Sequence, residues 1–196
     1  VGTTVPPGAP SEGEVHAIGL GASGAWAGQD GLLAVYSNNG WAFIAPVAGW
    51  RAWNAPAGIN VVFDGVAWIE RAGAMSSNGA GFVHRSVEIE HSVVAGASST
   101  VAAALPGDAI VYGVTGRVLT PIGGATSFDI GVSGSTNRYG SGFGTGAGSW
   151  TRGITGSPLT YYAPTDLLLT AAGGSFDGTG TVRLAVHYAE LTIPRA

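Results

Sequence analysis

Hydrophobic and polar residues alternate over short stretches along most of this 196-residue chain. Runs of β-branched and aromatic residues recur between clusters of Gly, Asn, Asp and Ser, which is typical of short strands joined by tight turns. Only SSTVAAAL (98–105) has a composition compatible with a helix, because it is apolar and lacks Gly and Pro. We therefore expect an almost all-β fold.

The first third of the chain contains two related segments that predict β-hairpins. In AVYSNNGWAF (34–43) and NVVFDGVAWI (60–69), an aromatic residue precedes a tryptophan by five positions, with Asn-Gly or Asp-Gly between them. These dipeptides supply the positive φ angles that a tight hairpin turn requires. Five of the six tryptophans lie before residue 70, so residues 1–70 are predicted to form a small Trp-rich β-hairpin module. Its core is expected to contain Trp41 and Trp68.

The rest of the chain predicts a linker followed by a larger β domain. The small and polar stretch RAGAMSSNGAG (71–81) is predicted to be the linker. Residues 82–196 hold alternating segments separated by Gly-rich turns, which favours a jelly-roll-like antiparallel β-sandwich. The strand-like segments are SVEIEHSVV (86–94), AIVYGVTGRVLT (109–120), SFDIGVS (127–133), DLLLTAA (166–172) and TVRLAVHYAELTIP (181–194). In the last of these, Val182, Leu184, Val186 and Tyr188 share one face of the strand, but Leu191 and Ile193 fall on the opposite face. A bulge near Ala189 is expected to return them to the core.

Composition and charge exclude several classes of partner. The chain has eight Arg, no Lys and twelve acidic residues, giving a formal charge of −4, and the arginines are dispersed. Nucleic-acid binding requires a concentrated basic face, so no nucleic-acid partner is expected. No apolar run approaches the roughly 20 residues of a membrane-spanning helix, so no membrane insertion is expected. Without Cys the redox compartment cannot be read.

The motifs of cofactor, metal and covalent chemistry are weak or missing. GLGASG (19–24) matches the dinucleotide fingerprint, but the following AWAGQDGLL has no helical pattern that could direct amides at a pyrophosphate. The four histidines lack metal-ligand spacing, and no nucleophile-elbow sequence occurs. We expect no cofactor, no metal and no catalytic residues. A glycosidase remains an alternative, since Glu88 or Glu90 could act with a distant carboxylate.

Aromatic side chains beside Arg, Asn and Asp indicate a different chemistry, the binding of a neutral or acidic saccharide. The C–H faces of sugar rings stack on aromatic rings, and their hydroxyls need directional hydrogen-bond partners. The segments NRYGSGF (137–143), SWTR (149–152) and TYYAPTD (160–166) are expected to present such residues on surface loops. The predicted carbohydrate-binding residues are Arg138, Tyr139, Trp150, Arg152, Tyr161, Tyr162 and Asp166, together with Trp50 and Trp53 of the first module. At most one of Tyr161 and Tyr162 is expected in a site, because they alternate faces on a strand.

The Trp-rich module also resembles a known family. The elements G-A-W-A-G, G-W-x-F, P-x-x-G-W and D-G-x-A-W, between about residues 10 and 70, resemble an uncharacterised domain of fibre and spike proteins in alphaproteobacterial prophages and gene transfer agents. LTPIGGATSFDIGVSGSTNRYGSGFG, YYAPTDLLLTAAGG and RLAVHY are similar to the module that often follows it. Family members usually carry an additional N-terminal region, and this chain begins at Val1 without a signal segment, so we expect it to be part of a longer polypeptide.

The resemblance implies a receptor-binding head spike or tail fibre on the surface of a phage-like particle, extracellular after release. Such a protein would be a homotrimer that contacts other particle proteins and binds bacterial cell-surface or capsular polysaccharide without catalysis. The alternatives are a purely structural virion component and a polysaccharide-degrading spike enzyme. No catalytic residues are carried over from the family.

Overall fold

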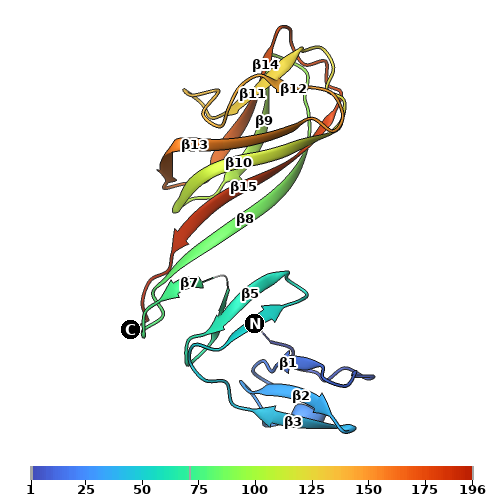
Figure 1. The fold of residues 1–196 in the computed structure, drawn as a ribbon, viewed down its shortest axis with the longest axis vertical. Coiled ribbons are helices and arrows are strands. Elements are labelled where there is room, and N and C mark those ends of the chain that lie inside the picture. The colour runs from blue at the N-terminus through green and yellow to red at the C-terminus, as the bar shows by residue number, and fades with distance from the viewer. Residues whose placement is uncertain (1, 71, 196) are drawn as a thin grey trace. The chain divides into compact units, whose positions relative to one another are not determined.

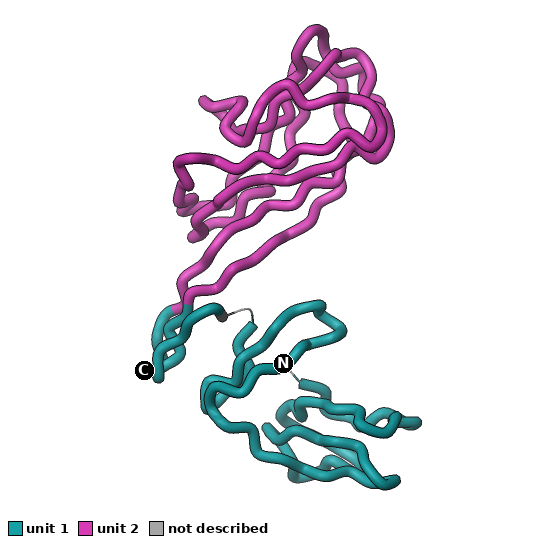
Figure 2. Tube along the Cα trace, viewed as in Figure 1, with its two compact units in different colours: residues 1–81, 193–196 teal, residues 82–192 magenta. Residues whose placement is uncertain are grey.

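The computed structural model describes residues 2–70 and 72–195, and the regular secondary structure among these residues is almost entirely antiparallel strand (Figure 1). The helical segment among them is a single 3₁₀ turn, Gly24–Trp26. The predicted all-β class is therefore confirmed. The chain divides into two compact units, residues 1–81 with 193–196 and residues 82–192, called unit 1 and unit 2 below (Figure 2).

The first sheet of unit 1 contains the first predicted hairpin. Its strands are β1 (Val15–Ala17), β2 (Leu33–Ser37) and β3 (Gly40–Ile44). Tyr36 pairs directly with Trp41, as the spacing predicts. The positive φ angles belong to Asn38 and Asn39, at 52° and 62°, and Gly40 begins the return strand. The turn is thus Asn-Asn, one residue earlier than predicted, and Asn tolerates this conformation better than most residues do.

The core of this sheet is built around Trp26, which is fully buried together with Ile18 and Ala34. Trp41 packs edge-on against Trp26 with ring centroids 5.0 Å apart and is itself half-buried. The predicted core residue Trp41 therefore covers a tryptophan that occupies the centre of the cluster.

The second sheet of unit 1 contains the second predicted hairpin. Its strands are β4 (Arg51–Asn54), β5 (Ile59–Phe63) and β6 (Trp68–Glu70). Phe63 pairs with Trp68, and their rings lie 5.3 Å apart with Trp68 half-buried. Between them Asp64 accepts hydrogen bonds from the amides of Val66 and Ala67 at 2.8 and 2.7 Å. The carboxylate therefore organises the turn.

The segment 71–81, predicted to be a linker, is instead structured. Residue 71 lies outside the described residues, but β7 (Ala72–Met75) forms a strand beside β8 (Gly81–Ser92). A turn joins them, in which the Ser76 amide donates to the Ala80 carbonyl at 2.8 Å. The C-terminal residues also depart from the prediction, because 193–196 belong to unit 1, where Arg195 donates to the buried Asp64 carboxylate.

Unit 2 is a sandwich of two antiparallel sheets. Besides β8 its strands are β9 (Ser98–Leu105), β10 (Ala109–Thr120), β11 (Ser127–Gly131), β12 (Phe143–Gly144), β13 (Trp150–Tyr161), β14 (Thr165–Ala172) and β15 (Thr181–Leu191). One sheet has the order β13-β10-β15-β8-β7 and the other has β12-β11-β14-β9. If β8 to β15 are numbered 1 to 8 and β7 is left out, the two orders are 6-3-8-1 and 5-4-7-2. This is the jelly-roll arrangement of two Greek keys.

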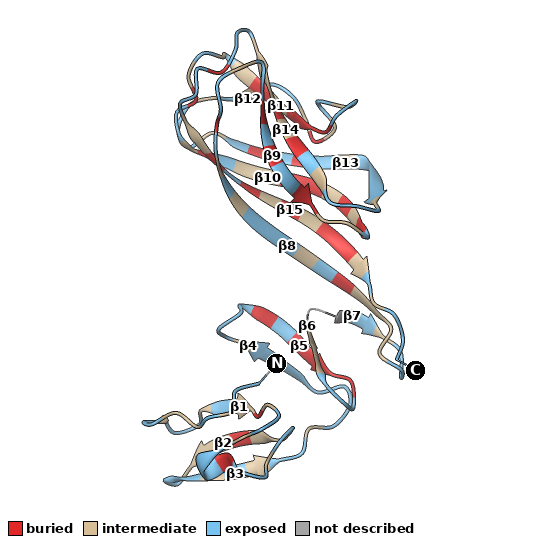
Figure 3. Cartoon of the chain, turned by 180° about the vertical axis from the view of Figure 1, so that it is seen from behind, coloured by how far each residue is buried: buried red, intermediate tan, exposed pale blue. Residues whose placement is uncertain are grey.

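Alternation along the strands of unit 2 fills the space between the sheets. On β15, Val182, Leu184 and Val186 are buried in one cluster with Leu167 and Leu169 of the opposite sheet, whereas the residues between them are less buried. Figure 3 shows buried and less buried positions alternating along this strand. The outer face of the five-stranded sheet is therefore left to polar and exposed aromatic side chains.

Two local features of unit 2 could not be read correctly from the sequence pattern. SSTVAAAL, the stretch compatible with a helix, is strand β9, which pairs with β14. No bulge interrupts β15, whose register with β8 is continuous to Leu191, so Leu191 and Ile193 are exposed. The neighbouring strand β10 instead has two register irregularities against β15, between Val111 and Gly113 and between Val118 and Thr120. The first arises because Tyr112 is an extra residue on that side of the ladder.

Candidate functional site

A row of functional side chains crosses the outer face of the five-stranded sheet in unit 2. Trp150 on β13 pairs with Arg117 on β10, Arg117 pairs with Arg183 on β15, and Arg183 pairs with Glu90 on β8. All four are exposed and lie between inward-facing neighbours. Neighbouring strands are about 4.8 Å apart, so the row spans about 14 Å.

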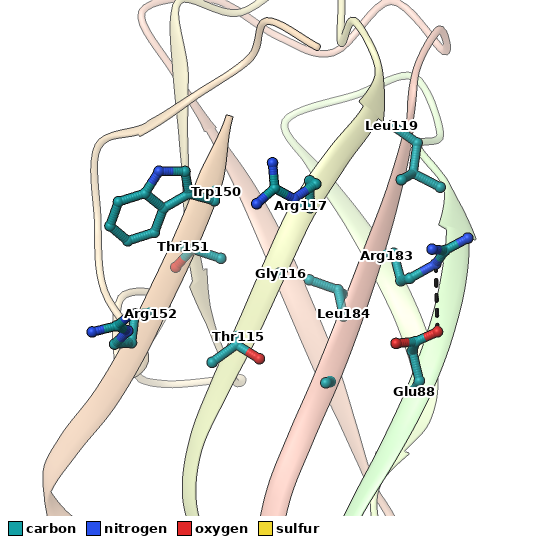
Figure 4. Close-up of a pocket in the computed structure, with 11 residues that line it drawn as sticks. Glu88, Thr115, Gly116, Arg117, Leu119, Trp150, Thr151, Arg152, Arg183 and Leu184 are labelled. Atoms are coloured by element: carbon teal, nitrogen blue, oxygen red, sulfur yellow. Dashed lines mark ion pairs between the residues drawn. The ribbon is translucent and has the colours of Figure 1, made fainter. Parts of the chain in front are cut away.

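Three residues of this row, Trp150, Arg117 and Arg183, line an open groove of about 480 Å³ (Figure 4). Its volume lies within the range of roughly 300 to 1,000 Å³ that is usual for small-molecule sites. The groove is lined by Glu88, Thr115, Gly116, Arg117, Leu119, Trp150, Thr151, Arg152, Arg183, Leu184 and Ala185. Three arginines and one glutamate therefore supply the charge on a protein that is negative overall.

The aromatic surface of the groove is Trp150, whose side chain is 63% exposed. The guanidinium carbon of Arg152, two residues along the same strand, lies 5.8 Å from the centre of the Trp150 ring. Arg117, on the adjacent strand, donates a long hydrogen bond of 3.3 Å to the carbonyl of Gly148. Strand positions hold these three side chains more rigidly than loops would.

The three arginines differ in their electrostatic state. Arg183 donates from Nε to Glu90 at 3.0 Å and lies 3.4 Å from Glu88. The hydrogen bond and charge of Glu90 raise the pKa of this guanidinium. Among the residues that the structure describes, neither Arg117 nor Arg152 has a carboxylate partner. Unneutralised positive charge is therefore concentrated beside Trp150.

One histidine, His187, borders the groove on the same sheet face. His187 contacts the hydroxyl of Ser86 through Nδ1 and that of Thr115 through Nε2, each at 2.8 Å. With both ring nitrogens occupied, the imidazole holds Thr115 in place at the edge of the groove.

Of the residues predicted to bind saccharide, the structure brings together Trp150 and Arg152. Both lie on strand β13, where a loop was predicted. Tyr139, also predicted to bind, is 1% exposed within the core, and its hydroxyl lies 2.9 Å from that of the half-buried Tyr161. Tyr139 was assigned to a surface loop because its neighbours are polar or Gly, but the segment folds back and bonds its amide to Ile130. It is not available to a ligand.

The remaining predicted residues of unit 2 lie apart from the groove lining. Arg138 is half-buried, and its Nε is enclosed without a hydrogen-bond partner in the described part of the chain. Tyr162 is 83% exposed. Asp166 accepts a 2.8 Å hydrogen bond from the amide of Ala103, which has a positive φ of 49°, so its role is to stabilise an irregularity of β9.

Trp50 and Trp53 lie in unit 1 and are 41% and 60% exposed. They line a second groove, of about 1,070 Å³ within unit 1, together with Arg51, Trp68 and Glu70 among others. These two indoles are therefore exposed to a ligand or partner, but they line a different groove from Trp150.

Sequence reasoning missed Arg117, Arg183 and Thr115, although a signal was present. In VTGRV (114–118) and VRL (182–184), a polar residue stands between two core residues of an alternating strand, which places it on the outer face. The pairing of these strands with β13 could not be read from either segment.

Other candidate chemistry has a structural explanation or no support. In the GLGASG segment the amides of Gly21 and Ala22 donate to the Asp30 carboxylate at 3.0 and 2.9 Å, so an internal anion occupies them. Within residues 2–70 and 72–195 no cluster of three or more His, Asp or Glu is placed to hold a metal ion. No helix in the same residues is long and apolar enough to cross a membrane.

The geometry defines an all-β protein with a Trp-rich N-terminal module and a jelly-roll domain bearing an Arg- and Trp-lined groove. Residues 1–69 match a family described as "Protein of unknown function (DUF2793)", which corresponds to the module predicted at 1–70. No curated protein matches the chain. A solved structure titled "Cyanophage Pam1 capsid asymmetric unit" is similar at 23% identity, with 61% of this chain and 91% of that chain covered and a TM-score of 0.40.

Proposed function

We propose that this protein is a receptor-binding component of a phage-like particle or gene transfer agent, a head spike or tail fibre. In this proposal unit 2 binds host cell-surface polysaccharide through the groove around Trp150, at the particle surface. The observation that carries the proposal is the exposed Trp150 ring between Arg117 and Arg152 on a rigid sheet. The assignment to a particle rests on the resemblance of the Trp-rich module to spike and fibre proteins.

The shape of the groove suits a segment of a polysaccharide. It is open and lies across four strands, so a chain could enter and leave at both ends. Its aromatic surface offers a stacking platform, and its arginines and Thr115 offer directional hydrogen bonds. Weak single sites suffice on a multivalent particle, because linked sites raise avidity by about 10²-fold or more without new contacts.

The proposed function is binding without catalysis. Glycoside hydrolysis in most families requires two carboxyl groups on either side of the scissile bond. The groove is lined by one carboxylate, Glu88, and both Glu88 and its neighbour Glu90 contact Arg183. Incubation with capsular polysaccharide should therefore release no reducing ends. Release that depends on Glu88 would establish the enzymatic alternative.

Adsorption to cells tests the proposal. Purified protein should bind capsulated alphaproteobacterial host cells, and Trp150→Ala should reduce this binding strongly without changing the melting temperature. Tyr162→Ala is the matched control, because it removes an exposed aromatic ring that lies outside the groove lining. Equal binding by wild type and Trp150→Ala, or equal binding to capsule-free cells, would contradict the proposal.

A second candidate, a purely structural virion component, is favoured by a different observation in unit 1. Trp50 and Trp53 are exposed, and so are Val47 and Val66 in the same stretch of the chain. Exposed apolar groups gathered in one part of a chain mark contact surfaces, and Trp is enriched at protein interfaces. We therefore assign unit 1 to contacts with other particle proteins or with copies of itself in a homotrimer. If Trp53→Ala abolishes particle assembly while Trp150→Ala changes neither assembly nor adsorption to cells, a purely structural role explains the protein.

A further inference from the structure

We infer that the groove selects acidic polysaccharides, those whose sugar rings carry carboxylates, over neutral ones of the same linkage. This inference rests on the proposed saccharide-binding function and specifies the chemical class of its ligand. It is carried by the placement of Arg117 and Arg152 around Trp150.

The two arginines are neighbours of Trp150 on two adjacent strands, Arg117 on β10 and Arg152 on β13. Arg117 stands directly opposite Trp150, and Arg152 lies two residues beyond Trp150, opposite Thr115. Direct cross-strand neighbours have Cβ atoms about 5 Å apart and diagonal neighbours about 7 to 8 Å apart. A ring stacked on Trp150 therefore has both guanidinium groups within reach of its substituents.

The charge of these two groups is not neutralised by a carboxylate in the described part of the protein. Arg183, in the same row, contacts two glutamates, whereas neither Arg117 nor Arg152 has a carboxylate partner among the residues described. Arg117 donates one long hydrogen bond to a carbonyl, and Arg152 lies against the indole. A guanidinium has five N–H donors in a planar arrangement that matches the two oxygens of a carboxylate.

Negative charge at the opposite side of the groove orients an acidic ligand. Glu88 and Glu90 lie on β8, three strands away from Trp150, and would repel an acidic ring bound there. The acidic substituent is therefore directed toward β13 and β10, and ring hydroxyls toward β15 and β8. A sulfate ester can also present two oxygens to a guanidinium, so sulfated dextran is included below as a separate probe.

A matched pair of probes tests the inference with the intact protein. Isothermal titration calorimetry would compare oligogalacturonate with the same oligomer after reduction of its carboxyl groups to alcohols, which retains the rings and linkages. The acidic form should bind at least tenfold more tightly, and raising the salt concentration from 50 to 500 mM should weaken this binding but not that of the reduced form. Arg117→Gln and Arg152→Gln should each weaken acidic binding about tenfold and weaken binding of the reduced oligomer clearly less, because Gln keeps hydrogen-bonding capacity but removes the charge.

The control variant is Arg51→Gln, which removes the same charge from unit 1. It should bind like wild type, and a loss equal to that of Arg152→Gln would overturn the assignment of the anionic site to this groove. If both oligomers bind equally and Trp150→Ala abolishes both, the acidic preference is refuted while the saccharide-binding function stands. If sulfated dextran binds more tightly than oligogalacturonate, the preference for carboxylates is refuted. If neither oligomer binds but cells still adsorb the protein through Trp150, the inference fails and the proposed function does not.

Discussion

Replacement of Tyr139 tests which aromatic residues stabilise unit 2 and which are free to bind a ligand. The ring is 1% exposed within the sandwich core, and its hydroxyl lies 2.9 Å from that of Tyr161. Tyr139→Ala should cost about 3 to 5 kcal/mol of unfolding free energy, because a large buried ring leaves a cavity. Tyr139→Phe should cost only about 1 kcal/mol, because it removes one hydrogen bond and the half-buried Tyr161 hydroxyl can turn to water.

The same side chain predicts a dependence of stability on alkaline pH. Burial, aided by the hydrogen bond with Tyr161, raises the pKa of Tyr139 well above its ordinary value of 10.0. Its contribution to stability is therefore fully present below pH 10 and declines as the pH rises, because the unfolded chain then ionises first. The decline has a limiting slope of about 1.4 kcal/mol per pH unit. Since Tyr139→Phe lacks this ionisation, its unfolding free energy should approach and then exceed that of wild type above pH 10.

Urea unfolding between pH 7 and 11, followed by near-ultraviolet circular dichroism, measures both effects. Tyr162→Phe is the matched control, because it makes the same chemical change at a ring that is 83% exposed. It should leave the urea midpoint unchanged at every pH. The assignment of Tyr139 to the core would be refuted if Tyr139→Ala unfolded at the wild-type urea concentration, or if Tyr162→Phe reproduced the alkaline difference.

Four further predictions concern stability and assembly. Trp26→Ala should destabilise unit 1 by about 3 to 5 kcal/mol in thermal unfolding, and Trp41→Ala by clearly less since it is half-buried; equal losses would contradict this order. Burial alone would raise the pKa of Asp64, but hydrogen bonds from two turn amides and Arg195 lower it below 3.8. Unit 1 should therefore lose stability as the pH falls below about 3.8 in an acid titration, and Asp64→Asn should reduce this dependence. Asp166→Ala should cost about 1 kcal/mol in urea unfolding without affecting saccharide binding in calorimetry, and reduced binding would restore it to the site. Analytical ultracentrifugation should give about three times the chain mass of 19.5 kDa, and a monomer would contradict the trimer.

Local sequence was sufficient wherever a turn and its flanking residues determine the structure. The spacing of Tyr36 from Trp41 and of Phe63 from Trp68 predicts both hairpins, because cross-strand partners around a short turn are close in sequence. Local composition did not predict the strand at SSTVAAAL. This stretch is compatible with a helix, but its pairing with β14 overrides that preference.

Burial of single aromatic residues was also beyond local reasoning. Tyr139 and Trp150 both stand among Gly and polar residues, yet they are 1% and 63% exposed. The difference arises because Tyr139 folds back against β11, whereas Trp150 occupies the outward position of a strand. Whether another segment covers a ring depends on contacts between residues that are distant in sequence.

The amino-acid sequence by itself therefore determined the all-β class and most of the strands, since these follow from turn chemistry and a two-residue period. Only the tertiary structure decided that Trp150, Arg117, Arg183 and Glu90 form one row. Strands pair through backbone hydrogen bonds that are common to all residue types, so the neighbours of a strand are set by the packing of the whole sandwich.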